Sequence, residues 1–224
     1  MAFMKVFQFH RRACPPNLQG RRAFTLPEMV LVVAILVVLA MLLPALMARY
    51  PHVSRANCVN CLKEIGIAFR VWGGDNDGKY PMEVPAAQGG ARELIATGNV
   101  AGCFRVMSNE LSAPKILTCP EDSKHKPATN WAISRLNLSY FIGMNATNPS
   151  SPTVLSGDAN LLQNGRAVSA GKLNLWLNSI SWTKDRHGGG GNILLPDGSV
   201  QSVRQLGFTN LNGAYFATNR VVVP

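Results

Sequence analysis

The feature that most constrains this chain is an uncharged run of 20 residues, from Met29 to Ala48. As an α-helix with a rise of about 1.5 Å per residue, the run is about 30 Å long, which matches the hydrocarbon thickness of a bilayer. A secretory signal has a shorter apolar stretch followed by small residues, whereas this run leads into the bulky "MARYPHVSR". The run therefore predicts a membrane anchor that stays with the mature protein, and a buried core helix is the alternative.

Positive charge is concentrated before this run. Residues 1–23 contain five Lys and Arg residues and no acid, so they hold half of the formal net charge of +10. Because the cytoplasmic flanks of membrane helices are enriched in basic residues, this segment predicts a cytoplasmic N-terminus and a translocated C-terminal part. Beyond the run, Lys and Arg are scattered singly, a distribution that argues against a nucleic-acid-binding face.

A second helical pattern follows at residues 49–72. Within residues 54–72, "SRANCVNCLKEIGIAFRVW", apolar side chains recur at spacings of three and four, the period of one helix face. The stripe consists of Cys58, Cys61, Leu62, Ile65, Phe69 and Trp72. We therefore expect residues 49–72 to continue the anchor as an amphipathic helix packed on a domain. Gly73 and Gly74 are helix-terminating residues, and "DNDG" at 75–78 is typical of the turn that follows.

Residues 73–224 are rich in turn residues and contain short apolar segments. Five of these have strand length, namely "KILTC", "LSYFIG", "PTVLSGD", "GNILL" and "SVQSVRQL". "GNILLPDGSVQSV" is the clearest hairpin, because Pro196-Asp197-Gly198 supplies the turn. "VAGCFRVMSNELS" is expected to form a short helix. The sequence thus predicts an α+β fold, in which a long N-terminal transmembrane and amphipathic helix packs on a small, mostly antiparallel β-sheet domain.

The segment at the start of the anchor resembles the N-terminus of type IV pilins and of type II secretion pseudopilins. A basic leader, "FTLPE" and an apolar helix occur in that order across residues 21–48. In that family a prepilin peptidase cuts just before the phenylalanine and methylates the new amino terminus. The resemblance implies a leader of residues 1–23, cleavage between Ala23 and Phe24, N-methylation of Phe24 and an assembly helix at 24–48. Ala23 stands where the family usually has glycine.

Glu28 lies just inside the apolar helix, where a carboxylate in lipid costs about a few kcal/mol or less, depending on its depth. A positive amino terminus close by would offset that cost. The resemblance implies that Glu28 pairs with the methylated amino terminus of an adjacent subunit and thereby sets the axial stagger of subunits in a filament. The alternative is that Glu28 lies at the lipid headgroups, near the positive end of the helix dipole.

A second resemblance lies near the C-terminus. "HGGGGNILLPDGSV" places nine residues between His187 and Asp197-Gly198. This H-x9-DG segment, together with "CVNCLKEIGIAFRVWGGDNDGKYP" and "KILTCPED", is similar to pilin-like proteins of planctomycete and verrucomicrobial bacteria. If residues 188–196 are extended, at about 3.3 Å per residue, His187 and Asp197 are roughly 30 Å apart. We therefore expect structural roles, with Asp197 and Gly198 in the turn and His187 hydrogen-bonding a loop or packing on the sheet.

Removal of the leader would take Cys14 and leave Cys58, Cys61, Cys103 and Cys119. An even number of cysteines in an exported protein suggests disulfides. Cys58 and Cys61 lie at i, i+3 of one helix, a poor geometry for pairing with each other. Cross-pairing with Cys103 and Cys119 would tie the helix to the sheet domain and leaves two connectivities, of which we expect Cys58–Cys119 with Cys61–Cys103. Free thiols and a four-cysteine zinc site are the alternatives, and the zinc interpretation lacks a second close pair of cysteines.

The acidic loops and the histidines suggest no further site. "DNDG" lacks the EF-hand continuation with its twelfth-position glutamate, and Asp158, Asp185 and Asp197 are scattered along the chain. The sequence contains no motif of a serine hydrolase, a P-loop protein or a zinc protease. It therefore predicts no metal, no cofactor and no enzymatic activity.

Together these features predict a pilin-like or pseudopilin structural subunit. Prepilin peptidase would process it, and it would assemble with other pilin-like subunits, identical or different, through its hydrophobic helix into a type II secretion or type IV pilus-type filament. It would lie in the bacterial inner membrane with a periplasmic C-terminal domain, and at the cell surface after assembly. The alternative is a single-pass envelope protein whose exported domain binds a surface ligand without forming filaments. The sequence does not separate secretion from adhesion, motility or DNA uptake, nor a major from a minor subunit.

Overall fold

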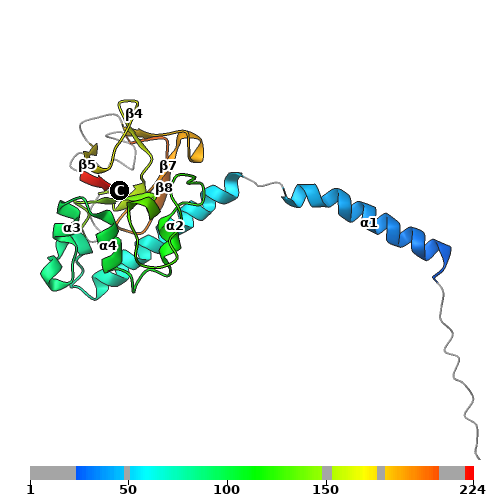
Figure 1. The fold of residues 1–224 in the computed structure, drawn as a ribbon, viewed down its shortest axis with the longest axis horizontal. Coiled ribbons are helices and arrows are strands. Elements are labelled where there is room, and N and C mark those ends of the chain that lie inside the picture. The colour runs from blue at the N-terminus through cyan, green and yellow to red at the C-terminus, as the bar shows by residue number, and fades with distance from the viewer. Residues whose placement is uncertain (1–23, 48–50, 148–152, 176–179, 207–219) are drawn as a thin grey trace, which may run out of the picture. The chain divides into compact units, whose positions relative to one another are not determined.

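The computed structural model describes residues 24–47, 51–147, 153–175, 180–206 and 220–224. The chain divides into two compact units, residues 1–49 and residues 50–224 (Figure 1). Among the described residues, the first unit contains one helix, and the second contains the remaining helices and all of the strands.

The first unit contains helix α1, Leu26–Met47. Its described side chains, from residue 26 to residue 43, are all exposed. Over Leu26–Leu43 the mean hydropathy is 2.8 and none of the window is buried. Within the described residues, α1 is the one helix long and apolar enough to cross a membrane. Its length and composition fit a membrane anchor, and its position near the N-terminus also fits a signal sequence.

The second unit begins with helix α2, Pro51–Gly74. Its apolar stripe faces the domain as predicted. The stripe residues that are buried are Cys58, Leu62, Ile65, Phe69 and Trp72, and Cys61 is partly buried. Phe69 also packs edge-on against Tyr80, with ring centroids 5.6 Å apart. Residues 48–50 lie outside the described residues, so the continuity of α1 and α2 as one long helix stays a prediction.

The acidic segment after α2 forms the predicted turn. Asp77 and Gly78 have positive φ angles of 54° and 74°, a left-handed conformation that glycine adopts freely and aspartate tolerates. The Gly78 N–H donates to the Gly73 carbonyl at 2.8 Å and so closes the end of the helix. The helix itself ends at Gly74, two residues beyond the expected boundary.

Short helices fill the chain between α2 and the first strand. They are η1 Pro81–Glu83, η2 Ala86–Gln88, α3 Arg92–Ala96, α4 Val100–Val106, η3 Pro114–Leu117 and η4 Arg135–Asn137. Helix α4 confirms the predicted short helix, and the Asn99 side chain caps it by accepting from the Gly102 N–H at 2.8 Å. The predicted strand at "KILTC" is wrong, because these residues lie largely in η3. Pro114 at the first position of η3 fixes φ at a helical value and starts a turn there.

The strands form two antiparallel sheets. The six-stranded sheet has the order β5-β10-β1-β2-β7-β8 and the four-stranded sheet the order β4-β3-β6-β9. The larger sheet consists of β1 Tyr140–Gly143, β2 Ser156–Asp158, β5 Gly171–Asn174, β7 Gly191–Leu194, β8 Val200–Val203 and β10 Arg220–Val223. The smaller consists of β3 Leu161–Gln163, β4 Arg166–Ala167, β6 Ile180–Trp182 and β9 Gln205–Leu206. Strand β10 lies between β1 and β5, and the red end of the chain lies beside the label of β5 in Figure 1.

The central strands β1, β2 and β7 of the six-stranded sheet are buried on both faces. Along β1, Tyr140 and Ile142 join the core beneath α2, α3 and α4, whereas Phe141 joins a second core against the smaller sheet. Ile193 and Leu194 of β7 divide in the same way. This alternation follows from the two-residue period of a strand. The unit is therefore layered, with helices, the larger sheet and the smaller sheet in that order.

The predicted α+β class is confirmed in its coarse form. The structure contains an N-terminal apolar helix and a domain in which every described strand pair is antiparallel. Helix α2 packs on this domain through contacts with β7 and β8.

Candidate functional site

The predicted processing site lies at the edge of the described residues. Ala23 is outside them, and Phe24 is the first residue that the structure describes. The Phe24 side chain is 77% exposed. The described side of the predicted cleavage position is therefore exposed within its own unit.

Glu28 lies in the first turn of α1, where the structure gives its carboxylate a local partner. Glu28 Oε2 accepts from the Thr25 N–H at 2.7 Å and from the Thr25 hydroxyl at 2.8 Å. These bonds satisfy a backbone donor at the start of the helix. A threonine followed three residues later by a glutamate is a capping pattern visible in the sequence, and the sequence-based interpretation missed it.

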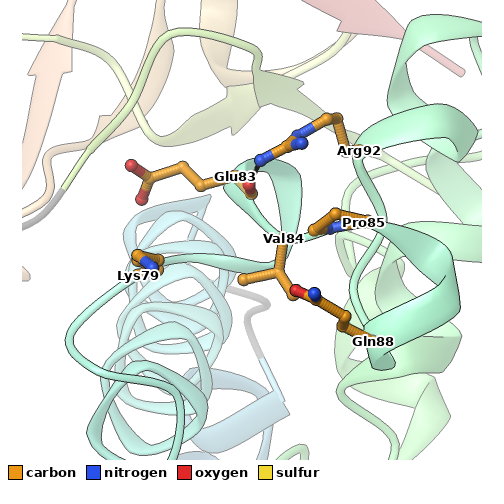
Figure 2. Close-up of a pocket in the computed structure, with 6 residues that line it drawn as sticks. All are labelled: Lys79, Glu83, Val84, Pro85, Gln88 and Arg92. Carbon is orange, nitrogen blue, oxygen red and sulfur yellow. Dashed lines mark hydrogen bonds between the residues drawn. The ribbon is translucent and has the colours of Figure 1, made fainter.

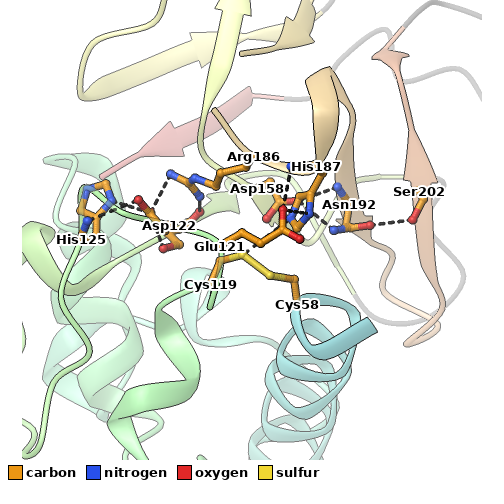
Figure 3. Close-up of a disulfide and its surroundings, with 11 residues drawn as sticks. Cys58, Cys119, Glu121, Asp122, His125, Asp158, Arg186, His187, Asn192 and Ser202 are labelled. Atoms are coloured by element: carbon orange, nitrogen blue, oxygen red, sulfur yellow. Dashed lines mark hydrogen bonds and ion pairs between the residues drawn. A yellow bond between two sulfur atoms is a disulfide. The ribbon is translucent and has the colours of Figure 1, made fainter. Parts of the chain in front are cut away.

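A disulfide between Cys58 and Cys119 joins α2 to the loop that follows η3 (Figure 3). The two residues are 61 apart in the sequence, with Cα atoms 5.3 Å apart. In the chain-entropy model a loop of that length stabilises the fold by about 4 kcal/mol. This was the first of the two predicted pairs, and the structure contains it.

The second predicted pair, Cys61–Cys103, is not formed, and both residues are thiols. Cys61 is partly buried and packs against the core beneath α2. Burial raises the pKa of Cys61. Cys103 lies in α4 with its side chain fully buried, and burial raises its pKa to about 12. The two thiols therefore occupy separate packing positions rather than a shared one, and the Cys103 thiol stays protonated and unreactive.

His187 lies beside the disulfide, in the short 3-10 turn η6, His187–Gly189. All three residues of this turn have positive φ angles, so the glycines that follow His187 permit the turn. The turn directs the fully buried imidazole at Cys119, whose Sγ is 3.6 Å from Nε2. On its other side, Nδ1 lies 2.9 Å from Oε2 of Glu121.

Asp158, at the end of β2, completes this buried cluster. Its Oδ2 lies 3.5 Å from His187 Nε2 and accepts from the Asn192 N–H at 2.7 Å and the Asn192 side-chain amide at 3.0 Å. Its Oδ1 is buried and makes no hydrogen bond to any described residue. Burial raises the pKa of Asp158, and the neighbouring charge of His187 and the Asn192 N–H oppose that effect. An unsatisfied carboxylate oxygen in a protein interior is costly.

A second buried carboxylate, Asp122, is fully paired. It contacts the Arg186 guanidinium at 2.7 Å, accepts from the Ser139 hydroxyl at 2.6 Å and lies 2.6 Å from His125 Nδ1 (Figure 3). Burial alone raises the pKa of Asp122, but the Ser139 hydrogen bond and the Arg186 charge outweigh burial, and the pKa is lowered. Arg186 also donates to the Ser139 carbonyl at 3.1 Å. This group holds the strands and the loop after η3 together.

Asp197 and Gly198 lie in the β7–β8 hairpin turn, as predicted. Asp197 Oδ1 accepts from the Ser199 N–H at 2.8 Å and the Ser199 hydroxyl at 2.7 Å, and these bonds lower the Asp197 pKa. Gly198 has a φ of 85°. The structure therefore assigns Asp197 to the turn and His187 to the disulfide cluster, with no contact between them.

A shallow surface hollow lies beside η1, lined by Lys79, Glu83, Val84, Pro85, Gln88 and Arg92 (Figure 2). Its charged groups serve local structure. The Glu83 carboxylate accepts from the Tyr80 N–H at 2.8 Å, and the Arg92 guanidinium donates to the Glu83 carbonyl. Glu83 and Arg92 of the hollow are thus engaged in local hydrogen bonds.

No protein-family model matches this chain, and neither the curated proteins nor the solved structures yield a match.

The sequence alone did not bring His187, Asp158 and Glu121 together. Asp158 and His187 are separated by 29 positions and lie on different elements, so no local period connects them. Glu121 was not considered, although it is two residues from Cys119. Only the paired strands and the disulfide place these groups at one point.

Proposed function

We propose that this chain is a pilin-like structural subunit that prepilin peptidase processes between Ala23 and Phe24. Its N-terminus would be cytoplasmic and its domain periplasmic, anchored in the bacterial inner membrane by α1. Subunits would assemble through α1, with Glu28 facing the methylated Phe24 amine of a neighbour, into a type II secretion or type IV pilus-type filament. Its role is structural rather than enzymatic.

The observation that carries this proposal is the surface of α1. Every described side chain of this helix is exposed, and apart from Glu28 the window Leu26–Leu43 is uncharged. An all-apolar helix of this length needs either lipid or other apolar helices around it. The order of basic segment, "FTLPE" and apolar helix is the reason for choosing a filament subunit from among the membrane-anchored classes.

Glu28 makes the proposal testable, because substitutions can separate its role as a helix cap from the proposed role in assembly. The carboxylate caps its own helix through Thr25 at 2.7 and 2.8 Å. Glu28→Gln keeps the shape and removes the charge that would attract an amine. Thr25→Val removes the hydroxyl bond of the cap and keeps the carboxylate. Both variants would be produced in a host with the prepilin peptidase and the assembly machinery.

We expect Glu28→Gln to be cleaved normally and to lose incorporation into filaments by at least tenfold, because a charge-assisted pair is lost. Thr25→Val serves as the matched control and should incorporate at close to the wild-type level. Sheared filaments and membrane fractions, quantified by immunoblot, measure both steps. Normal incorporation of Glu28→Gln, or an equal loss in both variants, would contradict the assembly role.

A second candidate is a single-pass anchored protein that forms no filament. One observation favours it, namely that Thr25 already satisfies Glu28 within a single chain. Single cysteines placed along residues 30–43 distinguish the two candidates by oxidative crosslinking in membranes. A periodic ladder of crosslinked species supports assembly, and monomer at every position supports the lone anchor.

A further inference from the structure

The cluster around the disulfide contains more ligand atoms than a structural disulfide requires. Cys58 Sγ, Cys119 Sγ and an imidazole nitrogen of His187 all lie within 4.8 Å of one another (Figure 3). Asp158 Oδ2 lies 3.5 Å from the same nitrogen, His187 Nε2. Two sulfurs, an imidazole and a carboxylate therefore converge on one buried point.

The spacing of these atoms matches the edges of a tetrahedral zinc site. With Zn–S near 2.3 Å and Zn–N or Zn–O near 2.0–2.1 Å, a tetrahedron places S and N about 3.6 Å apart and N and O about 3.4 Å apart. The observed Cys119 Sγ to His187 Nε2 distance is 3.6 Å, and the His187 Nε2 to Asp158 Oδ2 distance is 3.5 Å. Two ligand edges are thus already at the separation that zinc requires.

The groups behind these atoms are arranged as in a metal site. Histidine ligands are usually oriented by a carboxylate at the other ring nitrogen. Glu121 Oε2 lies 2.9 Å from His187 Nδ1, close enough to pair with the ring, although the angle there is not that of a hydrogen bond. The same oxygen accepts from the His187 N–H at 2.9 Å and so holds the turn. Ligating carboxylates are themselves hydrogen-bonded, and Asn192 donates twice to Asp158 Oδ2.

Asp158 provides an independent sign of a missing partner. Its side chain is fully buried, and Oδ1 has no hydrogen-bond partner in the described part of the chain. Buried carboxylates are normally paired or coordinate a metal. A cation bound to this carboxylate beside His187 and Cys119 would offset the cost of burying its charge.

We propose that the thiol form of this chain binds one Zn²⁺ through Cys58, Cys119, His187 and Asp158. The ribosome delivers both cysteines as thiols, so the metal form requires no reductant. Loading replaces two S–H bonds by two Zn–S bonds and releases two protons. The two thiolates, Asp158 and Zn²⁺ leave one net negative charge. Arg55, whose guanidinium donates to the His187 carbonyl at 2.9 Å, lies close enough to offset it.

Thiolate and imidazole ligands select zinc over calcium or magnesium, which prefer oxygen donors. Zinc binding and disulfide formation exclude each other, because each uses both sulfurs. Either one joins α2 to the loop after η3, so the domain is held together in both the reduced and the oxidised state. This inference concerns the domain alone and stands or falls independently of filament assembly.

The test uses full-length protein in detergent, reduced with excess phosphine under nitrogen and titrated with Co²⁺ as a spectroscopic substitute for zinc. We expect one cobalt per chain, a thiolate-to-cobalt charge-transfer band and the visible bands of tetrahedral cobalt, all abolished by added Zn²⁺. The unreduced protein should show none of these. Circular dichroism and tryptophan fluorescence, recorded on the same samples, monitor the fold.

Four variants separate this site from other thiols. Cys61→Ser is the matched control on the same helix and should bind like the wild type, whereas Cys58→Ser should lose the charge-transfer band. Asp158→Asn and Glu121→Gln should each weaken cobalt affinity by about 10–100-fold, as expected for ligand and supporting carboxylates. A band that survives Cys58→Ser contradicts the proposal, and so does a reduced wild-type protein without the band, whether it stays folded or unfolds.

Discussion

Helices α1 and α2 are of similar length, 22 and 24 residues, and they meet opposite requirements. Every described side chain of α1 is exposed, although nearly all are apolar. Helix α2 has one buried stripe, and polar residues occupy much of its remaining surface. The difference shows that α2 is stabilised by its own domain, whereas α1 needs surroundings that a single chain does not supply.

The largest expected effect of a single substitution lies on the buried stripe of α2. Phe69→Ala should lower the free energy of unfolding of the domain by about 3–5 kcal/mol, because it leaves a cavity in the core. Phe69 is fully buried and packs edge-on against Tyr80. Ile67→Ala, on the exposed face of the same helix, is the control and should cost less than about 1 kcal/mol. Urea unfolding of the full chain in detergent, followed by tryptophan fluorescence, measures both, and equal effects would mean that α2 does not pack as described.

A substitution in α1 is expected to change membrane insertion and to leave the stability of the domain unchanged. Leu36→Lys places a charge at the centre of the apolar run and should disfavour membrane insertion by about 2.5–3.5 kcal/mol. Leu36 is 58% exposed and belongs to the first unit rather than to the domain, so the unfolding midpoint of the domain should not change. Carbonate extraction of membranes measures insertion, with Leu36→Ile as the control. A wild-type chain that carbonate extracts from membranes would show that α1 is not a transmembrane segment.

A smaller and pH-dependent effect is expected at Asp122, in the loop after η3 of the domain that holds α2. The folded-state pKa of Asp122 is lowered, with burial outweighed by Ser139 and Arg186. The stability that this group contributes is therefore present above the unfolded-state pKa of about 4 and is lost as pH falls through the folded-state value. Asp122→Asn should cost about 1–3 kcal/mol at neutral pH and flatten the acid limb of the stability curve. Asp185→Asn, in an exposed pair with Lys124, is the control and should change little. An unaltered acid limb in Asp122→Asn would contradict this assignment.

Local pattern was sufficient for some elements. The spacing of Cys58, Leu62, Ile65 and Phe69 predicted the buried face of α2, and the Pro-Asp-Gly triplet predicted the hairpin between β7 and β8. The strand predicted at "KILTC" was wrong because an apolar run of strand length does not reveal that Pro114 starts a 3-10 turn. Strands of two to four residues, such as β3 and β4, give too few positions for a period to show.

The candidate site depends on long-range contacts, which local pattern does not report. The Cys58–Cys119 pair could be predicted because four cysteines allow only a few pairings. Whether Cys61 and Cys103 also pair depends on which way each side chain faces, and the sequence does not show this. His187 was expected to have a structural role, and its proximity to Asp158 follows from the pairing of β2 with β7. The residue types indicated which side chains could take part in a site, and the sheet topology determined which of them lie close together.

The central claim is that α1 becomes an assembly helix after cleavage before Phe24. Mass spectrometry of the N-terminal peptide, on protein isolated from its native host, tests this most directly. The account predicts a chain that begins at Phe24 with one methyl group on its amine. A chain that still contains residues 1–23, or one that begins elsewhere with an unmodified amine, would contradict it.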